Sequence, residues 1–434
     1  MLARLDLRGS TAPLDEVLPR PGLGEGNPKE AVQNILAQVK TNGDDALREL
    51  TERFDGCRPS SLVIGRSEME AALGRVPEDF RRALETAAKN IRLHHQDQQE
   101  KKRTVSRQGL TVESWAQPVE RAGCYVPGGR AAYPSTVLMT AIIARVAGVK
   151  ECVVCVPPGP DGLVPDATLA AAAVAQVDVV HPVGGAQAIA ALAYGTESVK
   201  PVEVIVGPGN VYVALAKREV AGLVAVPSAF AGPSEVVVIA DESAPPELVA
   251  IDLMVQAEHG PQGLAWLITW DSATADRVYE ALQDLLITAP RRAEIESTLQ
   301  DAGYCVLVDD PAQALAVSDA IAPEHLEIMT TEADVLAARV RHAGAIFCGP
   351  WSPASLGDYV AGPSHVLPTA GTARFSGALT ISDFTKEMHI VTASPEAIEK
   401  LGPTVVVLAE AEGLDAHAAS LRIRQDLLIG QNDD

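Results

Sequence analysis

Short runs rich in Val and Ile alternate with Ala-rich segments of helical pattern after about residue 108. A first series contains the strand-like VKECVVCVPPG, VDVVHPVG and VEVIVGPG, each followed by a helix-like stretch such as GAQAIAALAYG. A second series begins at GPSEVVVIADE and ends with the strand-like GAIFCG. Such alternation predicts βαβ units around parallel sheets. The chain is therefore expected to form two similar α/β halves, although no residue-level repeat relates them.

The region before this alternation is helical in pattern. Apolar residues recur at helical spacing in KEAVQNILAQVKTNGDDALRELTERF, with a break at Asn42 and Gly43. A long polar helix is predicted next, and on it His94 and His95 are interpreted as surface residues. The last stretch, from about Leu379, is a mixed tail that ends in the helix-like LDAHAASLRIRQDLL.

Composition and charge exclude several classes of function. The chain has 434 residues, 47% hydrophobic and 21% charged, which is typical of a globular protein of enzyme size. Its formal net charge of -22 repels nucleic acid and anionic lipid, so neither is expected as a partner. No apolar run reaches the roughly 18 residues of a membrane span, and the start of the chain does not resemble a signal peptide. A cytoplasmic enzyme is therefore predicted.

The six cysteines are scattered without a disulfide framework. Cys152 and Cys155 form a C-x-x-C pattern, but they lie in a β-branched run that predicts a buried strand, where cysteine behaves as a small hydrophobic residue. One alternative stays open: Cys155, near the end of that strand, could be a covalent nucleophile.

Glycine-rich turns follow several of the predicted strands, at VPGGRAAYPS (126–135), VGGAQAIAAL (183–192) and VGPGNVYVAL (206–215). Each places small residues where a backbone could approach a phosphate at a helix N-terminus. None contains a complete G-x-G-x-x-G motif. The third turn matches its first two glycines with Gly207 and Gly209, but Tyr212 stands at the position of the third. Any one of them could be an ordinary tight turn, but three in one half favour nucleotide binding.

Three clusters of histidine and acidic or amide residues interrupt the apolar pattern. Gln256 and His259 share one face of a predicted helix end, which suits two metal ligands or, alternatively, a helix C-cap by His259. Asp358 and His365 lie in a loop rich in Gly, Pro and Ser, a usual place for a site.

The third cluster is Glu324 and His325, which follow Pro323 just before the predicted strand HLEIM. Adjacent residues in a strand point to opposite faces, so both side chains can reach one site only if Glu324 precedes the strand. A carboxylate beside an imidazole suits general base chemistry.

At these residues the chain resembles the histidinol dehydrogenase family. The resemblance covers nearly the whole length and rests on family-like segments in the same order: YVPGGRAAYPSTVLM, GGAQAIAALAYGTESV, GPGNVYVALAKREV, GPSEVVVIAD, QAEHGP, PEHLEI and WSPASLGDYVAGPSHVLPT. It implies the four-electron oxidation of L-histidinol through L-histidinal to L-histidine, the last step of histidine biosynthesis. It also implies two NAD+ used in succession and one zinc ion per site.

The resemblance further implies roles for individual residues. The expected zinc ligands are Gln256, His259, Asp358 and His417, with His417 donated by the other subunit of a homodimer. His325 would take the alcohol proton, and Glu324 would activate the water that adds to the aldehyde. The zinc ligands and His325 would also contact the substrate, together with Ser234, His365 and Glu412. Positions that match NAD contacts are Tyr125, Gln187 and Asn210.

The expected fold is α/β, with two similar incomplete Rossmann-like three-layer domains built on parallel sheets. The boundaries drawn from the sequence give an N-terminal helical region at 1–108 and a first, NAD-side domain at 109–233. A second domain at 234–378 would carry zinc and the base, and a C-terminal tail at 379–434 would contact the partner subunit.

Alternatives remain at the level of function. The related dehydrogenases of sulfonated diols share much of the scaffold, although Glu412 and His417 favour histidinol. A zinc hydrolase would use Glu324 to activate a metal-bound water, and a nucleotide-binding regulator would need none of the clusters. The sequence does not distinguish zinc from manganese, and His389 matches no family role.

Overall fold

The computed structural model describes residues 2–19, 28–99, 101–128, 131–228, 234–258 and 263–432. The chain divides into two compact units. The first unit comprises Met1–Gln98 and Val119–Phe384, and the second comprises Gln99–Pro118 and Thr385–Asp434. Within the described ranges, the first unit carries two parallel sheets and the second carries an antiparallel one.

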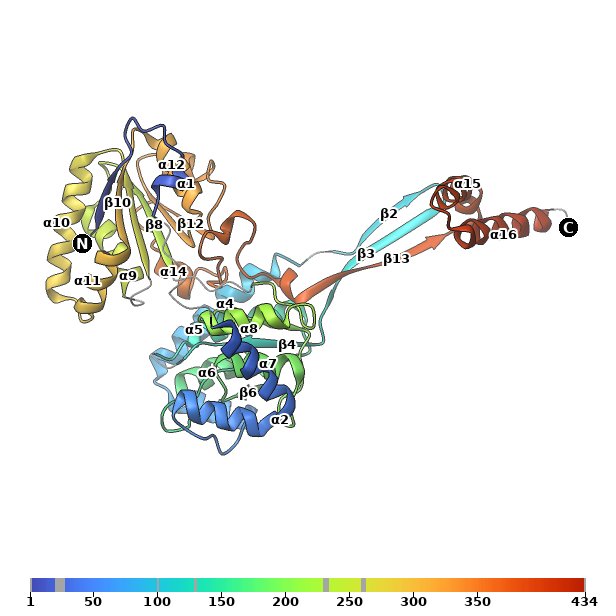
Figure 1. Ribbon diagram of the computed structural model, residues 1–434, viewed down its shortest axis with the longest axis horizontal. Helices are drawn as coiled ribbons and strands as arrows, with labels where there is room; N and C mark the ends of the chain where they lie inside the picture. Colours follow the sequence, from blue (N-terminus) through green and yellow to red (C-terminus); the bar gives the residue numbers. More distant parts are fainter. Residues whose placement is uncertain are drawn as a thin grey trace. The chain divides into compact units, whose positions relative to one another are not determined.

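One core of the first unit is a four-stranded parallel sheet with the order β6-β5-β4-β7 (Figure 1). Alternate residues of a strand face opposite sides, so Cys152 and Val154 pack against one layer of helices whereas Val153 and Cys155 pack against the other. The strands are β4 (Arg121–Tyr125), β5 (Glu151–Cys155), β6 (Val179–His181) and β7 (Val204–Val206). The first layer is α3 (Arg66–Arg75), α4 (Glu78–Gln96), α5 (Pro134–Ala147) and α6 (Asp166–Val174), and the second is α2 (Lys29–Asp55), α7 (Gly185–Tyr194) and α8 (Val211–Val220).

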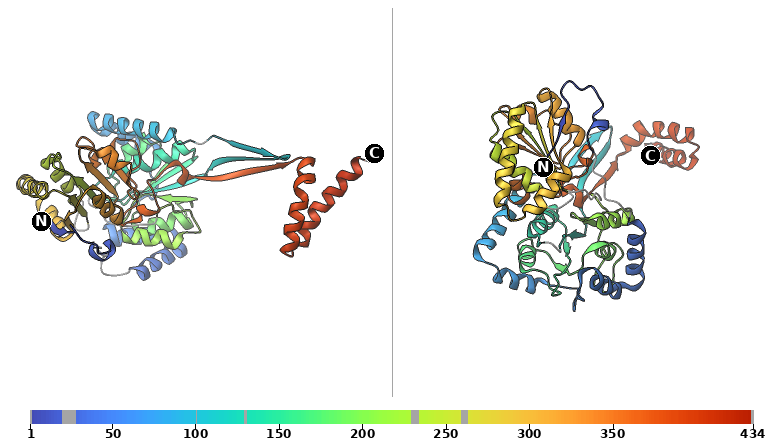
Figure 2. Two further views of the ribbon diagram at one scale, coloured as in Figure 1. Left: turned by 90° about the horizontal axis from the view of Figure 1, so that it is seen from above. Right: turned by 60° about the vertical axis from the view of Figure 1, so that its left-hand side comes forward.

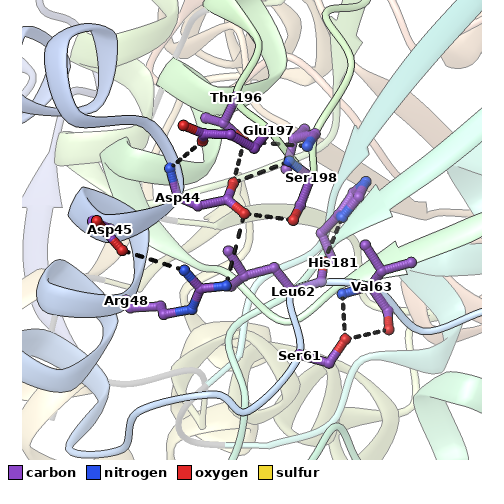
Figure 3. Close-up of polar contacts among 11 residues, drawn as sticks. Asp44, Asp45, Arg48, Ser61, Leu62, Val63, His181, Thr196, Glu197 and Ser198 are labelled. Carbon is purple, nitrogen blue, oxygen red and sulfur yellow. Dashed lines mark hydrogen bonds and ion pairs between the residues drawn. The ribbon is translucent and has the colours of Figure 1, made fainter.

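Helix α2 is kinked at the break predicted from the sequence. Gly43 has φ 53° and ψ -129°, and a Cβ there would lie 2.3 Å from a carboxylate oxygen of Glu197. The kink is held by the next residue, Asp44, whose carboxylate accepts hydrogen bonds from Thr196 Oγ1 at 2.7 Å and from Ser198 N at 3.1 Å (Figure 3). Glu197 in turn accepts one from Asp44 N at 2.8 Å. This cluster fixes α2 to the loop that follows α7.

The second core of the first unit is a six-stranded parallel sheet with the order β1-β10-β9-β8-β11-β12 (Figures 1 and 2). Its strands are β1 (Ala3–Asp6), β8 (Glu235–Ala240), β9 (Leu264–Thr269), β10 (Gly303–Leu307), β11 (His325–Met329) and β12 (Ala345–Cys348). One face packs on α9 (Pro246–Ala257), α10 (Ser272–Thr288) and α11 (Arg292–Ala302). The other packs on α1 (Leu14–Val17), α12 (Pro311–Ile321) and α13 (Ala333–Ala337).

A connecting region follows β12. It contains α14 (Ala354–Tyr359) and two short 3₁₀ turns, η1 (Thr372–Arg374) and η2 (Ile381–Phe384). Its later part packs on the first layer of the four-stranded sheet, because Val366, Leu379 and Phe384 belong to that core. The predicted loop around His365 therefore contacts the first α/β half although it follows the second in sequence.

The second unit is a three-stranded antiparallel sheet with a pair of helices (Figure 2). Its elements are β2 (Arg103–Arg107), β3 (Leu110–Pro118), β13 (Thr385–Ala393), α15 (Pro395–Ala411) and α16 (Asp415–Asn432). Positive φ angles at Gln108 (49°) and Gly109 (76°) form the tight turn between β2 and β3, as primed hairpin turns require.

The predicted α/β fold with parallel sheets is confirmed. The structure differs from the sequence prediction in two respects. The region expected to be helical also supplies β1 to the six-stranded sheet and β2 to the second unit, and His95, expected at the surface, is buried beside Gln98. β1 pairs with β10 from Ala3↔Tyr304 to Asp6↔Leu307, a pairing so distant in sequence that local periodicity gives no sign of it. In the described part of the chain, no helix combines the length and apolarity needed to cross a membrane.

Candidate active site

The centre of the candidate site lies where α12 gives way to β11. Helix α12 ends at Ile321, Ala322 takes a left-handed conformation with φ 54°, and the strand begins only at His325. Glu324 therefore precedes the strand, which is the condition under which its side chain can share a site with that of His325. The structure meets this condition, because Glu324 Oε2 lies 3.7 Å from His325 Nδ1 and both side chains are less than a tenth exposed.

The backbone of Glu235, the first residue of β8, contacts both of these side chains. Its N–H donates to Glu324 Oε2 at 3.1 Å, and its carbonyl oxygen lies 3.3 Å from His325 Nδ1. A carbonyl accepts hydrogen bonds only, so this contact places a proton on Nδ1. The other ring nitrogen, Nε2, lies 3.4 Å from Asp358 Oδ1 and has no aligned hydrogen bond within the described ranges. Nε2 is thus the atom of His325 that can accept a proton.

The charges of this cluster shift the pKa values of both groups. Burial raises the pKa of Glu324 to about 7, against the opposing effects of His325 and of the Glu235 N–H. For His325, burial acts to lower the pKa, but the carboxylates of Glu324 and Asp358 outweigh it and raise the value to about 9. A carboxyl group that titrates near neutrality can exchange protons at physiological pH, as general base catalysis requires.

The backbone of Glu324 is held in place by close contact with the start of β12. Ala345 N donates to Glu324 O at 2.9 Å, and a Cβ on Gly344 would lie 2.6 Å from the same oxygen. Only glycine allows β12 to approach this closely. Ser234 also belongs to the cluster, because its hydroxyl donates a hydrogen bond to Glu324.

His365 connects α14 to the first α/β half. Its Nδ1 lies 2.9 Å from the carbonyl oxygen of Asp358, and its Nε2 lies 3.2 Å from Thr136 Oγ1 near the start of α5. Nδ1 must donate to the carbonyl, so Nε2 accepts from the threonine hydroxyl. Burial lowers the pKa of His365, which favours the neutral ring that these two bonds need. Thr136 was not predicted from the sequence.

The predicted zinc ligands are only partly placed by the structure. Gln256 is buried in the last turn of α9, and its Nε2 has no hydrogen-bond partner among the described residues. Asp358 lies at the His325 cluster, whereas His259 falls outside the described residues. His417 belongs to the second unit, as does Glu412, and both side chains are exposed there. In the described part of the chain, no group of three or more His, Cys, Asp or Glu side chains is arranged to hold a metal ion.

The residues predicted to contact NAD lie at the carboxyl ends of the four-stranded sheet, the edge where α/β folds bind ligands. Tyr125 ends β4, and its hydroxyl oxygen accepts a hydrogen bond from Gly185 N at 3.1 Å. Gln187 is buried in the first turn of α7, next to that glycine turn. Asn210 caps α8, its side-chain oxygen accepting from Tyr212 N and Val213 N.

The third of these turns contains a glycine that its packing requires. Gly207 has φ 105°, and a Cβ there would lie 2.0 Å from the carbonyl oxygen of Tyr125. The turn after β7 is therefore packed directly on the end of β4. Gly129 and Arg130, part of the first glycine-rich turn, lie outside the described residues.

The cysteines of the C-x-x-C pattern are buried, as the sequence predicted. Cys152 Sγ lies 3.7 Å from Cys124 Sγ on the neighbouring strand, and Cys155 packs in the core between the sheet and the second helix layer. Burial raises the pKa of the Cys155 thiol far above its usual range, which opposes formation of a nucleophilic thiolate.

These features define an α/β enzyme whose buried Glu-His pair suits proton transfer. Comparison with known proteins identifies the family: the model of the histidinol dehydrogenase family matches residues 19–425. A histidinol dehydrogenase from Parasynechococcus marenigrum is 49% identical over 394 residues, covering 91% of this chain and 90% of that protein. One from Pseudomonas aeruginosa is 46% identical over 415 residues, covering 95% and 94%.

A solved structure gives the same result. The crystal structure of histidinol dehydrogenase from Elizabethkingia anophelis superimposes with a TM-score of 0.94 at 32% sequence identity, covering 98% of each chain. This chain belongs to the histidinol dehydrogenase family, and the resemblance found in the sequence is confirmed. It is accordingly an oxidoreductase.

Proposed function

We propose that this protein oxidises L-histidinol through L-histidinal to L-histidine, reducing two NAD+ in succession, as the last step of histidine biosynthesis. Membership of the family supports the substrate and the reaction. The observation that carries the proposal is the buried pair of Glu324 and His325, in which Nδ1 of the imidazole is held by the Glu235 carbonyl and Nε2 remains able to accept a proton.

In the first oxidation, His325 Nε2 accepts the hydroxyl proton of the alcohol while a hydride leaves the same carbon for the nicotinamide. In the second, Glu324 takes a proton from the water that adds to the aldehyde carbon. Once His325 has released its first proton to solvent, the resulting hydrate anion loses a hydride to the second NAD+ and its hydroxyl proton to His325, which gives the carboxylate. Each base is buried, so water other than the reacting molecule is kept from the aldehyde.

The donor set fits a zinc ion. Gln256 is a buried amide, and no hydrogen bond to its Nε2 within the described ranges fixes the orientation of the amide group. Asp358 adds a carboxylate. With the imidazoles of His259 and His417, these residues form the nitrogen and oxygen set that zinc prefers. When bound, zinc would hold the imidazole and amine of the substrate and orient its alcohol carbon. Removing the metal with a chelator and then measuring the activity restored by zinc or by manganese would show which of the two metals the site prefers.

The remaining site residues have proposed binding roles. Ser234 and His365 contact the substrate, and Glu412 recognises its amine as a counter-charge. Tyr125, Gln187 and Asn210 contact NAD at the glycine turns. The cytoplasmic location expected from the sequence remains a prediction.

We further propose a homodimer in which His417 of one subunit completes the site of the other. A complementation experiment tests this. Co-expressed His417→Ala and Glu324→Gln chains would form heterodimers with one intact site, so activity should recover above that of either variant alone. Activity equal to that of the separate variants would contradict a shared site.

The reaction itself is tested by following NAD+ reduction with purified protein. Histidinol should give two NADH per molecule and histidinal one, both should be lost to a chelator, and both should return with zinc. A zinc hydrolase would show no change at the NADH absorbance band, and a nucleotide-binding regulator would bind NAD+ without reducing it. Turnover of a sulfonated diol in preference to histidinol would favour the related dehydrogenases instead.

A further inference from the structure

Two buried carboxyl groups lie behind the candidate site, and neither has a part in the reaction as proposed. Glu327 is on β11, two residues after His325, and is 1% exposed; Asp252 is on α9, one turn before Gln256, and is 9% exposed. Residues two apart on a strand share a face, so Glu327 lies on the same side of the sheet as His325. Met329, two residues further, packs on α9 in the same core, which identifies that side as the α9 side.

Glu327 also binds the element that carries Asp358. Its Oε1 accepts a hydrogen bond from the N–H of Ala354 at 2.7 Å. Ala354 is the first residue of α14, where backbone N–H groups have no partner within the helix. Asp358 follows one turn later on the same helix. The carboxyl of Glu327 therefore joins β11 to α14.

The second oxygen of Glu327 faces Asp252. Glu327 Oε2 is buried, and no N–H or hydroxyl group donates to it within the described ranges. Its hydrogen-bonding neighbour is instead the carboxyl group of Asp252. Two carboxylates without a proton between them would repel in a medium of low dielectric constant, so one of them must be protonated. Burial raises the pKa of both groups, so the pair holds one proton between its two carboxyl groups.

We propose that Asp252 and Glu327 are positioning residues, which as one proton-sharing carboxyl pair hold α9, β11 and α14 together behind the site. These three elements carry Gln256, His325 and Asp358. The pair thus sets the spacing between two of the proposed metal ligands and the proposed base. This inference rests on the proposed function, since it assigns the pair to that site.

A test compares two substitutions of Glu327 in the full-length zinc-loaded enzyme. In Glu327→Gln, the side-chain oxygen can still accept from Ala354 N, and the amide can donate to Asp252. In Glu327→Leu, both bonds are lost at similar volume. We expect Glu327→Gln to keep wild-type behaviour, and we expect Glu327→Leu to lose about 10–100-fold in zinc affinity and in kcat/KM for histidinol, the range found for groups that orient metal ligands.

Zinc affinity is measured by competition with a chromophoric chelator, without turnover, and the KM for NAD+ is measured as the control, which should not change. A folded Glu327→Leu variant with wild-type zinc affinity would overturn the inference. So would a Glu327→Gln variant that loses as much as the leucine variant, because a charged carboxylate would then be needed. If Glu327→Leu does not fold, Glu327→Gln and Asp252→Asn decide: wild-type zinc affinity in both supports the pair, and loss in either contradicts it.

The wild-type enzyme in the same assays keeps the two proposals apart. A wild type that reduces no NAD+ with histidinol refutes the proposed function. A wild type that turns over normally, beside a leucine variant equal to it, refutes only the positioning role.

Discussion

Glu324 Oε2 and His325 Nδ1 lie 3.7 Å apart, and the peptide group of Glu235 contacts both of them. Neighbouring residues seldom act on one substrate from a strand, because their side chains point to opposite faces. Here the strand begins at the histidine, so the glutamate remains in the preceding turn. Two groups with different proposed roles thereby lie in one buried cluster, and each influences the pKa of the other.

Replacing Glu324 with Gln should separate the two oxidations. The amide keeps the size of the side chain but does not accept a proton from water, so histidinal oxidation should fall by about 100-fold or more. Histidinol oxidation to histidinal should continue, because His325 is intact. The measurement is single-turnover NADH formation from each substrate, with release of aldehyde followed by a trapping reagent.

The exposed Glu332, at the start of α13, provides the matched control. Glu332→Gln removes the same charge from an exposed position beyond the other end of β11 and should leave both oxidations unchanged. Equal loss of both steps in Glu324→Gln would contradict a role confined to the water step.

The pKa values of the pair predict a rise of activity with pH. Both groups act as bases in the proposed reaction, so each must be deprotonated in the free enzyme. With Glu324 near a pKa of about 7 and His325 near about 9, the rate of histidine formation from histidinol should increase across this interval and level off above it. Since the two groups interact, the observed values belong to the pair.

Glu324→Gln gives a second reading of the same profile. Its carboxylate is a cause of the raised pKa of His325, so its removal should move the remaining step to lower pH. A profile of the variant that keeps its step near the wild-type position would show that Glu324 does not act on His325 electrostatically.

The sequence predicted the sheets better than it predicted their edges. The predicted strand HLEIM is observed as β11. Strands and helices of this kind can be predicted because the alternation of apolar segments along the chain reflects local structure. β1 lies in the region that was expected to be helical, since its pairing with β10 across hundreds of residues leaves no local pattern. β2 lies there too, although its hairpin with β3 is local and was missed. The antiparallel pairing of β3 with β13 was likewise invisible.

The site shows a similar division. The pairing of Glu324 with His325 was stated in the sequence analysis together with its geometric condition, which the structure meets. Glu235 and Glu327 were missed, because each was taken as part of an apolar strand. A signal was present, since an acidic residue within an otherwise apolar strand must be buried and therefore needs a partner.

The buried Cys155 should be dispensable for catalysis. Burial raises its thiol pKa far above the usual range and its side chain packs in the core, so Cys155→Ala should leave the NADH yield at two per histidinol. The loss of the buried sulfur should lower the free energy of unfolding by about 1 kcal/mol. Cys152→Ala, in the same strand on the opposite face, is the matched control. Selective loss of the second oxidation in the Cys155 variant alone would revive the covalent mechanism.

The Asp44 cluster should make the fold sensitive to acid. Burial acts to raise the pKa of Asp44, but hydrogen bonds from Ser198 and Thr196 outweigh it and lower the value below that of the unfolded chain. A lowered carboxyl pKa contributes stability at neutral pH that is lost as the pH falls through the folded-state value. Asp44→Ala should therefore lower the free energy of unfolding by about 2 kcal/mol at neutral pH, and by less in acid, as measured by urea denaturation at both pH values.

Asp45→Ala removes an exposed carboxylate whose ion pair with Arg48 spans 3.5 Å, and it should have little effect at either pH. Equal destabilisation by the Asp44 variant at both pH values would show that lost packing, and not the ionised carboxylate, holds the kink of α2.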